Sequence, residues 1–342
     1  MVYRAKAPLR LGLAGGGTDV SPYSDLYGGA ILNATISLYA RAHIEPLPDP
    51  VILLHAADRG ETETHPFRDV LPLTGKLDLL KGVFNRIRKD HGMPAEIRGF
   101  RLTTHVDAPA GSGLGTSSTL VVAIIGAFAE MLGLPLGEYD ISRYAYENER
   151  VDMGLAGGKQ DQYAATFGGV NFMEFYDNNK VIVNPLRIKP EYLDELETNL
   201  VLYYTDTTRE SAGIIEEQQK NVSASDSSSI GAMHQLKEQS RMMKEALLQG
   251  RLHEIGEILD FGFRQKRLMA KNISNSRIEE IYAAALAAGA LGGKISGAGG
   301  GGFMIFYCPG TTRYQVINAL EPFGGQVRPF SFSKNGLVSW RG

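Results

Sequence analysis

The stretch Pro109-Ala-Gly-Ser-Gly-Leu-Gly-Thr-Ser-Ser118 stands between a strand-like pattern at 100–106 and a strongly apolar helical pattern at 117–132. Its glycines allow successive backbone N–H groups to turn toward one side, and three hydroxyl side chains follow them. A helix N-terminus carries unpaired N–H groups and a partial positive charge, so it attracts anions. A simple helix cap needs only one hydroxyl. We therefore predict a phosphate-binding loop formed by Gly111, Ser112, Gly113, Leu114, Gly115, Thr116, Ser117 and Ser118.

Two further glycine clusters lie far from this loop in sequence, at 15–17 and 297–302. Glycine is unfavourable inside regular elements, so dense clusters indicate tight turns or close approach of the backbone to a ligand. The alternative is a flexible linker, but the neighbouring residues are apolar rather than serine-rich or charged. We predict that the later cluster closes over the same phosphates through Gly297, Ala298 and Gly299.

Two carboxylates, Glu149 and Asp161, bracket a segment that is rich in glycine and polar residues. Glu149 lies near the end of a predicted helix at 138–151, and Asp161 follows the stretch 157–160 (GGKQ). Polar residues interleaved with glycine rarely build a core, which favours a functional role for this segment. We predict that Glu149 holds Mg²⁺ and that Asp161 acts on a hydroxyl proton.

Several familiar chemistries are excluded by the sequence. No G-x-x-x-x-G-K-[ST], H-E-x-x-H, C-x-x-C or G-x-S-x-G pattern occurs, and the seven histidines are scattered. The net charge of −3 gives no reason to expect a nucleic-acid or anionic-membrane partner. The single cysteine, Cys308, is typical of a reducing compartment, and no apolar run is long enough to span a membrane. We expect a soluble cytoplasmic protein.

The length of 342 residues predicts about two domains. The proline-bounded stretch 185–190 is the predicted boundary, giving domains at 1–189 and 190–342, and the stretch 221–230 (NVSASDSSSI) is predicted to be a mobile loop. Strands and helices mix without regular βαβ alternation, which indicates an α+β fold in two lobes. The predicted strands are 1–14, 29–42, 51–54, 100–106, 170–175, 181–183, 200–205, 303–308 and 327–331, and the predicted helices are 76–91, 117–132, 138–151, 231–249, 252–271, 276–288 and 313–320.

Three segments together resemble the GHMP family of small-molecule kinases. The family's first motif, P-x-R-x-x-L-x-G-(E/G)-x-(T/S)-D in its sugar kinases, matches 8–19. Its second motif, P-x-x-x-G-L-G-S-S, matches 109–117, with Thr116 in place of the first serine. Its third motif, K-x-(S/T)-G-A-G-x-G-G, matches 294–302. The matches follow the family's order and extend over most of the chain.

The resemblance implies a ribosomal-S5-like N-terminal lobe, a ferredoxin-like C-terminal lobe, and an active site in the cleft between them. It implies ATP and Mg²⁺ as the phosphoryl donor and metal. By motif position, the resemblance makes Ser117 and Glu149 the metal ligands, Asp161 the catalytic carboxylate, Arg10 the basic residue that polarises the acceptor hydroxyl, and Thr18 and Asp19 part of the sugar site. Such a division suits phosphoryl transfer, in which positioning and charge neutralisation supply most of the catalysis.

One departure from the motif narrows the expected substrate. Galactokinases have Glu-His where this chain has Gly16 and Gly17. The version with two glycines resembles the kinases that phosphorylate the anomeric hydroxyl of D-glycero-D-manno-heptose 7-phosphate or of L-fucose, and the missing side chains leave room for a bulkier sugar. We expect a heptose 1,7-bisphosphate as product, for nucleotide-activated heptose and lipopolysaccharide biosynthesis. The alternatives are an L-fucokinase, a galactokinase-like enzyme and a non-catalytic sensor of ATP and sugar. We expect the protein to be a monomer or a homodimer.

A phosphorylated acceptor needs a cationic pocket besides the ATP site. The candidates are Lys159, Arg209, and Lys266 or Lys271. Arginine grips phosphate with two parallel hydrogen bonds, so Arg209 is the first choice among them. It follows a predicted strand and lies among small polar residues. The alternative for each residue is an ordinary solvated cation.

Overall fold

A computed structural model describes residues 1–67, 70–207 and 211–342. Its strands are β1 (Tyr3–Ala14), β2 (Gly29–Leu47), β3 (Val51–Ala56), β4 (Glu61–Pro66), β5 (Gly99–Val106), β6 (Val170–Phe175), β7 (Val181–Pro185), β8 (Leu200–Tyr204), β9 (Gly292–Ile295), β10 (Phe303–Tyr307), β11 (Gln326–Val327) and β12 (Val338–Arg341). Its α-helices are α1 (Tyr23–Tyr27), α2 (Asp78–His91), α3 (Thr116–Leu132), α4 (Glu138–Glu147), α5 (Gln160–Phe167), α6 (Pro190–Asn199), α7 (Ser211–Ser223), α8 (Ser227–Gln249), α9 (Ile255–Lys266), α10 (Ser276–Ala287) and α11 (Thr312–Leu320).

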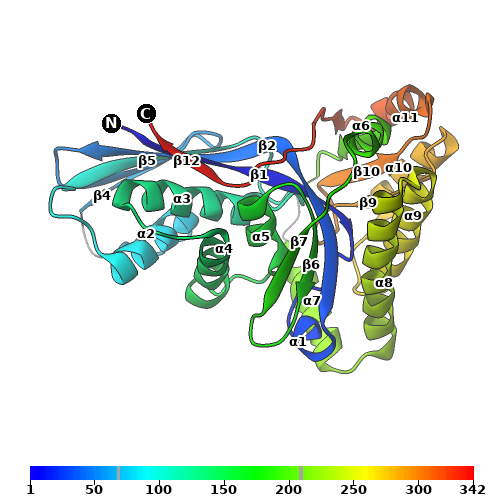
Figure 1. The fold of residues 1–342 in the computed structure, drawn as a ribbon, viewed down its shortest axis with the longest axis horizontal. Helices are drawn as coiled ribbons and strands as arrows, with labels where there is room; N and C mark the ends of the chain where they lie inside the picture. Colours follow the sequence, from blue (N-terminus) through cyan, green and yellow to red (C-terminus); the bar gives the residue numbers. More distant parts are fainter. Residues whose placement is uncertain (68–69, 208–210) are drawn as a thin grey trace.

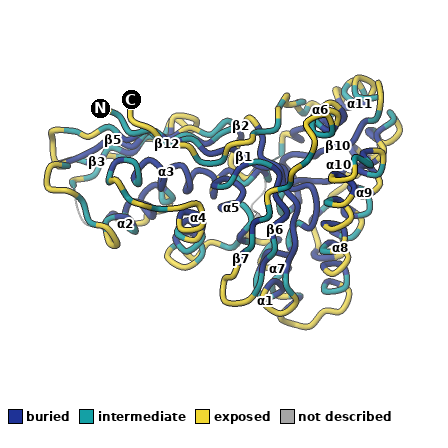
Figure 2. Tube along the Cα trace, viewed as in Figure 1, coloured by how far each residue is buried: buried dark blue, intermediate teal, exposed yellow. Residues whose placement is uncertain are grey.

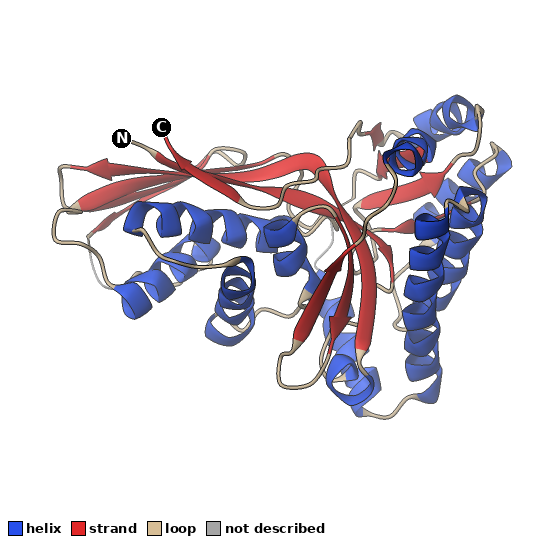
Figure 3. Cartoon of the chain, viewed as in Figure 1, coloured by secondary structure: helices blue, strands red, loops and turns tan. Residues whose placement is uncertain are grey.

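The N-terminal part is built on an eight-stranded sheet. Its strand order is β12-β1-β2-β5-β3-β4, and the hairpin of β6 and β7 joins the other half of the long strand β2. Helices α2 to α5 cover one face of this sheet (Figures 1 and 3). Helix α3 is apolar nearly all round because it lies between the sheet and the other helices, and it is almost entirely buried (Figure 2). This buried helix fixes the phosphate-binding loop that precedes it.

The C-terminal part has a smaller sheet, ordered β11-β8-β10-β9, in which all neighbouring strands are antiparallel. One hydrophobic cluster joins the two sheets, because Leu9 and Leu11 of β1 pack with Leu202 of β8 and with Met243 and Leu247 of α8. The two glycine-rich loops therefore approach one another across a packed interface. No helix in the described residues is long and apolar enough to cross a membrane.

The chain returns to its first sheet at the end. Strand β12 pairs antiparallel with β1, with Tyr3 opposite Arg341. The N- and C-termini consequently lie side by side (Figure 1). The predicted division at 189/190 stays a prediction, although this last strand belongs to the N-terminal sheet.

Most predicted elements form, but four expectations are wrong, one of which, the helix at 138–151, is described with the site below. The stretch 221–230 is not a loop, because α7 continues to Ser223 and α8 begins at Ser227. Asp226 caps α8 by accepting a hydrogen bond from the Ser229 N–H at 2.7 Å, so the serine-rich composition marks a helix start rather than mobility. The predicted helix at 252–271 is divided into a short 3₁₀ turn and α9, and the last predicted strand is replaced by the short β11 and by β12.

Candidate active site

The predicted phosphate-binding loop forms one wall of a cavity of about 280 Å³. Gly111, Gly113 and Gly115 have φ values of +72°, +85° and +76°, a backbone conformation that side chains disfavour. Helix α3 begins directly after them, at Thr116. Of the predicted loop, the residues that line the cavity are Gly111, Gly113, Gly115, Thr116, Ser117 and Ser118, whereas the buried Ser112 and Leu114 support the loop from behind.

The second glycine-rich loop packs directly on the first. Ser296 donates a hydrogen bond from Oγ to the carbonyl of Gly113 at 2.8 Å. A Cβ on Gly297 would come within 2.6 Å of the Gly113 Cα, so the close approach requires glycine at both positions. Gly297 and Ala298 line the cavity, whereas Gly299 packs against Ile273 instead.

The predicted catalytic pair, Arg10 and Asp161, meets in this cavity. Arg10 is almost fully buried on β1 and follows an irregularity in the pairing with β2. Its Nε and Nη2 each lie 2.7 Å from Oδ1 of Asp161, and its Nη1 donates to the Gly113 carbonyl at 2.6 Å. Asp161 occupies the first turn of α5. Arg10 thus joins the carboxylate to the phosphate-binding loop.

Glu149 reaches the same cavity through an irregular helix. The predicted helix at 138–151 ends early as α4, and a π-helix from Asn148 to Asp152 follows. This wider turn carries the buried Glu149 into the site, as π-helical turns often do for functional residues. Its carboxylate accepts hydrogen bonds from Ser118 Oγ at 3.1 Å and from Gln162 Nε2 at 2.5 Å. Burial raises the pKa of Glu149, while Arg150 and these two donors act in the opposite direction.

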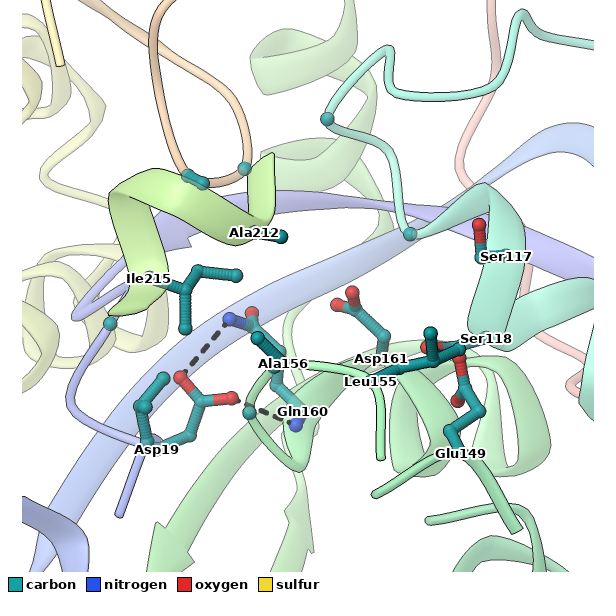
Figure 4. Close-up of a pocket in the computed structure, with 18 of the residues that line it drawn as sticks. Asp19, Ser117, Ser118, Glu149, Leu155, Ala156, Gln160, Asp161, Ala212 and Ile215 are labelled. Atoms are coloured by element: carbon teal, nitrogen blue, oxygen red, sulfur yellow. Dashed lines mark hydrogen bonds between the residues drawn. The ribbon is translucent and has the colours of Figure 1, made fainter. Parts of the chain in front are cut away.

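The two neighbouring serines of α3 differ in their surroundings. Ser118 is buried and contacts Glu149, whereas Ser117 is exposed at the start of the helix with its hydroxyl directed away from Glu149 (Figure 4). The structure therefore brings Ser118 to the carboxylate. The assignment of Ser117 to the metal, which came from motif position, stays a prediction.

Asp19 lies in the cavity on the other side of Asp161 from Glu149 (Figure 4). It is buried and accepts hydrogen bonds from the backbone N–H of Gln160 at 3.0 Å and from its side chain at 3.4 Å. A Cβ on Gly158 would overlap the Asp19 carboxylate, which explains the glycine there. Burial raises the pKa of Asp19, and the nearby Asp161 adds to the effect.

Comparison with known proteins agrees with this geometry. Residues 78–169 match the GHMP kinases N terminal domain, and residues 243–325 match GHMP kinases C terminal. A D-glycero-alpha-D-manno-heptose 7-phosphate kinase of Campylobacter jejuni is 49% identical over 338 residues, covering 99% of this chain and 98% of the relative. The chain belongs to the GHMP kinase family. It is therefore a phosphotransferase, as its motifs predict, and its fold is the predicted GHMP kinase fold.

A solved structure and a second relative are also similar to this GHMP kinase. The crystal structure of a D-glycero-D-manno-heptose 1-phosphate kinase from Bacteroides thetaiotaomicron has a TM-score of 0.83 and 46% sequence identity, with 99% of each chain covered. The L-fucokinase/L-fucose-1-P guanylyltransferase of Bacteroides fragilis is 28% identical over 87% of this chain but only 34% of its own length.

Three residues predicted for the sugar site make structural contacts. The buried Thr18 hydroxyl donates to the carbonyls of Gly15 and Ala30 and so holds the turn after β1. Lys159 is buried with its Nζ 3.5 Å from Asp25 Oδ1, and it is absent from the described residues that line the cavity. The space beside Gly17 is filled, because a Cβ there would lie 2.6 Å from the Met269 Cε.

The remaining candidates for the cationic pocket differ in whether they line the cavity. Arg209 lies outside the described residues. Lys271 is exposed, and the described cavity lining does not include it. Lys266, at the end of α9, is buried and lines the cavity. Three residues of α7 also line it, which sequence reasoning missed because no motif marks them: Ala212, Ile215 and Gln218.

Proposed function

We propose that this GHMP kinase transfers the γ-phosphoryl group of ATP to the anomeric hydroxyl of D-glycero-D-manno-heptose 7-phosphate, giving the 1,7-bisphosphate and ADP. The observation that carries the choice of acceptor is the full-length similarity to the Campylobacter jejuni heptose 7-phosphate kinase, at 49% identity. The chemistry is supported separately by the cavity in which both glycine-rich loops, Arg10, Asp161 and Glu149 meet. The product suits synthesis of a nucleotide-activated heptose.

The phosphates of ATP would be held by the first glycine-rich loop. Its positive-φ glycines and the N-terminus of α3 present backbone N–H groups to an anion. The second loop, at Gly297 and Ala298, would close the same space from the C-terminal side. Neutralising phosphate charge without reorganisation is the main contribution a protein makes to phosphoryl transfer.

Glu149 and Ser118 fit a magnesium ion that arrives with ATP. Magnesium prefers oxygen ligands and keeps several waters, so one carboxylate beside phosphate oxygens suffices. The buried carboxylate is held in place by Gln162, and no cluster of three or more metal-ligating His, Cys, Asp or Glu side chains occurs in the described ranges. Bound there, the ion would neutralise charge on the phosphates. Ser118 would orient Glu149 toward it.

Asp161 would take the proton of the acceptor hydroxyl. Both guanidinium contacts from Arg10 fall on Oδ1, so we assign Oδ2 as the oxygen that accepts the proton. The anomeric oxygen forms a bond to the γ-phosphorus, the bond from that phosphorus to the bridging oxygen breaks, and ADP leaves with the bridging oxygen. Asp19, bonded to Gln160, would accept hydrogen bonds from the sugar.

The names of the two heptose kinases place the acceptor's phosphate differently, on the 7- or the 1-position. Purified enzyme should therefore be given Mg·ATP with heptose 7-phosphate or with heptose 1-phosphate, and ADP release and the ³¹P spectrum of the product should be measured. We expect turnover of the 7-phosphate and a new anomeric phosphate signal. Turnover of the 1-phosphate alone, or of L-fucose alone, would contradict the proposed acceptor.

A further inference from the structure

Two buried lysines of the C-terminal part face the N-terminal part without a carboxylate at ion-pair distance in the described residues. Lys266 is 3% exposed and its Nζ donates to the Gly297 carbonyl at 2.5 Å. Lys294, on β9, is 4% exposed and its Nζ donates to the Gly12 carbonyl at 2.7 Å. Throughout 1–67, 70–207 and 211–342, no carboxylate forms an ion pair with either ammonium group. A buried charge without a partner is costly, so an ammonium group of this kind that also reaches a cavity is well placed to bind an anionic ligand.

Only one of these lysines reaches the cavity. Lys266 lines it together with Asp19 and Gly17, whereas Lys294 is absent from the described lining. Lys266 interacts electrostatically with Arg10 and with Asp19. A Cβ on Gly16 would lie 3.7 Å from the Lys266 Nζ, so the ammonium group lies beside the turn that leads from β1 to Asp19. Asp19 and Glu149 lie on opposite sides of Asp161 (Figure 4), which puts this turn on the acceptor side of the site.

The glycine at position 16 leaves the ammonium group of Lys266 without a carboxylate in contact with it. The motif of GHMP sugar kinases allows Glu or Gly here, and this chain has Gly16. A Cβ built on Gly16 would lie 3.7 Å from the Lys266 Nζ. A glutamate at this position would therefore stand beside the lysine and pair with it. Without that carboxylate, the same place in the sugar site offers a positive charge.

We infer that Lys266 binds the phosphate group that the acceptor already carries, the one that is not transferred. This inference rests on the proposed function, because it requires a phosphorylated acceptor. The ATP phosphates already have both glycine-rich loops and the Glu149–Ser118 pair. Lys266 lies between Gly297 of the second loop and the turn at Gly16, and it is the buried cation without an ion pair within the described lining. The hydrogen bond to the Gly297 carbonyl holds the ammonium group in place. Its other N–H groups would then donate to an oxygen of the phosphate.

Lys266→Met tests the inference, because methionine keeps the apolar stem and removes the charge. We expect a KM for heptose 7-phosphate that is about 10- to 100-fold higher, as loss of a charge-assisted hydrogen bond implies, with the KM for ATP within about twofold of the parent value. The KM for unphosphorylated heptose should not change. Lys266→Arg should recover part of the affinity. Lys271→Met, an exposed lysine five residues further along, is the matched control and should resemble the parent enzyme.

Two substitutions at Gly16 test the same charge without altering Lys266 itself. Gly16→Glu would place a carboxylate beside Lys266, and Gly16→Gln would add nearly the same bulk without charge. Since Gly16 has no positive φ, both side chains are compatible with its backbone. We expect Gly16→Glu to raise the KM for heptose 7-phosphate at least tenfold more than Gly16→Gln does. Equal effects of Gly16→Glu and Gly16→Gln on this KM would contradict an electrostatic role for the Lys266 ammonium group.

The outcomes separate this inference from the proposed function. If heptose 7-phosphate is turned over and Lys266→Met leaves its KM unchanged, or lowers kcat equally for phosphorylated and unphosphorylated heptose, the inference is wrong and the function stands. If another sugar phosphate is the acceptor and Lys266→Met raises its KM, the inference stands and the proposed acceptor is wrong. If only unphosphorylated sugars react, both are wrong.

Discussion

The two sides of the cavity differ in how their charged groups are paired. On one side, Asp161 is held by Arg10, and Glu149 accepts hydrogen bonds from Ser118 and Gln162. On the other side, the buried ammonium group of Lys266 contacts only a backbone carbonyl among the described polar groups. Preorganised groups act at once on a reacting centre, because no reorganisation is required during the reaction. An unpaired buried charge is costly, and we infer that Lys266 acquires its partner from the acceptor.

The largest expected effect lies on the paired side. Asp161→Asn keeps the size of the side chain but removes the proton acceptor, so kcat should fall by about 10²- to 10⁴-fold. The Kd for ATP should stay within about twofold, because Asp161 packs beside Gly115 but, within the described residues, its side chain forms no hydrogen bond to the first loop. Single-turnover ADP formation and calorimetric ATP binding check the two statements. A variant with normal turnover would remove Asp161 from the mechanism.

The next prediction distinguishes the two serines. Ser118→Ala removes a hydrogen bond to Glu149 and should weaken the apparent Mg²⁺ affinity by about 10- to 100-fold, as loss of a group that orients a metal ligand does. Ser117→Ala is the matched comparison. Titration of activity against Mg²⁺ at saturating ATP measures both. A larger effect of Ser117→Ala would restore the assignment made from motif position.

Replacing Lys266 should make the enzyme more stable although it weakens binding of the acceptor. Burial lowers the pKa of this lysine from 10.5 to about 8, which corresponds to about 3 kcal/mol of unfavourable free energy for the charged form near neutral pH. Lys266→Met should therefore raise the melting temperature of the enzyme without ligands. The parent should also gain stability between about pH 8 and 10.5, where the folded state has released a proton that the unfolded chain still holds. Unfolding monitored by circular dichroism across this range checks both; a lower melting temperature would contradict them.

The smallest effect is a dependence of acceptor recognition on pH. Below about pH 8 Lys266 is charged, and above it the ammonium group loses its proton, so kcat/KM for heptose 7-phosphate should decline above about pH 8. The nearby Arg10 contributes to lowering the pKa, while Asp19 opposes it. The decline should disappear in Lys266→Met. Persistence of the same decline in that variant would assign it to another group.

The sequence predicted the paired side better than the unpaired one. Arg10, Asp161 and the first loop lie in motifs in which glycine spacing and residue type are themselves informative, so their chemistry could be anticipated. Lys266 lies in no glycine motif, and its burial depends on how α9 packs beside Gly16 and Gly297. Such a contact between distant segments leaves no local pattern.

Local geometry limited the other predictions. The π-helical turn that carries Glu149 follows a sequence that is also compatible with an ordinary helix, so neither the turn nor the hydrogen bond between Ser118 and Glu149 could be derived from the sequence. Lys159 has the same residue type and glycine-rich context as a phosphate ligand, yet it turns toward Asp25 and Tyr146. Strand β12 is short and partly exposed, so its pairing with β1 gives only a weak signal.

A crystal structure with heptose 7-phosphate and a non-hydrolysable ATP analogue tests the difference between the two sides most directly. Our account predicts the 7-phosphate within hydrogen-bonding distance of the Lys266 Nζ, the anomeric oxygen beside Asp161, and the γ-phosphate of the analogue at the first glycine-rich loop. A sugar bound in the reverse direction, with its phosphate away from Lys266, would contradict the account.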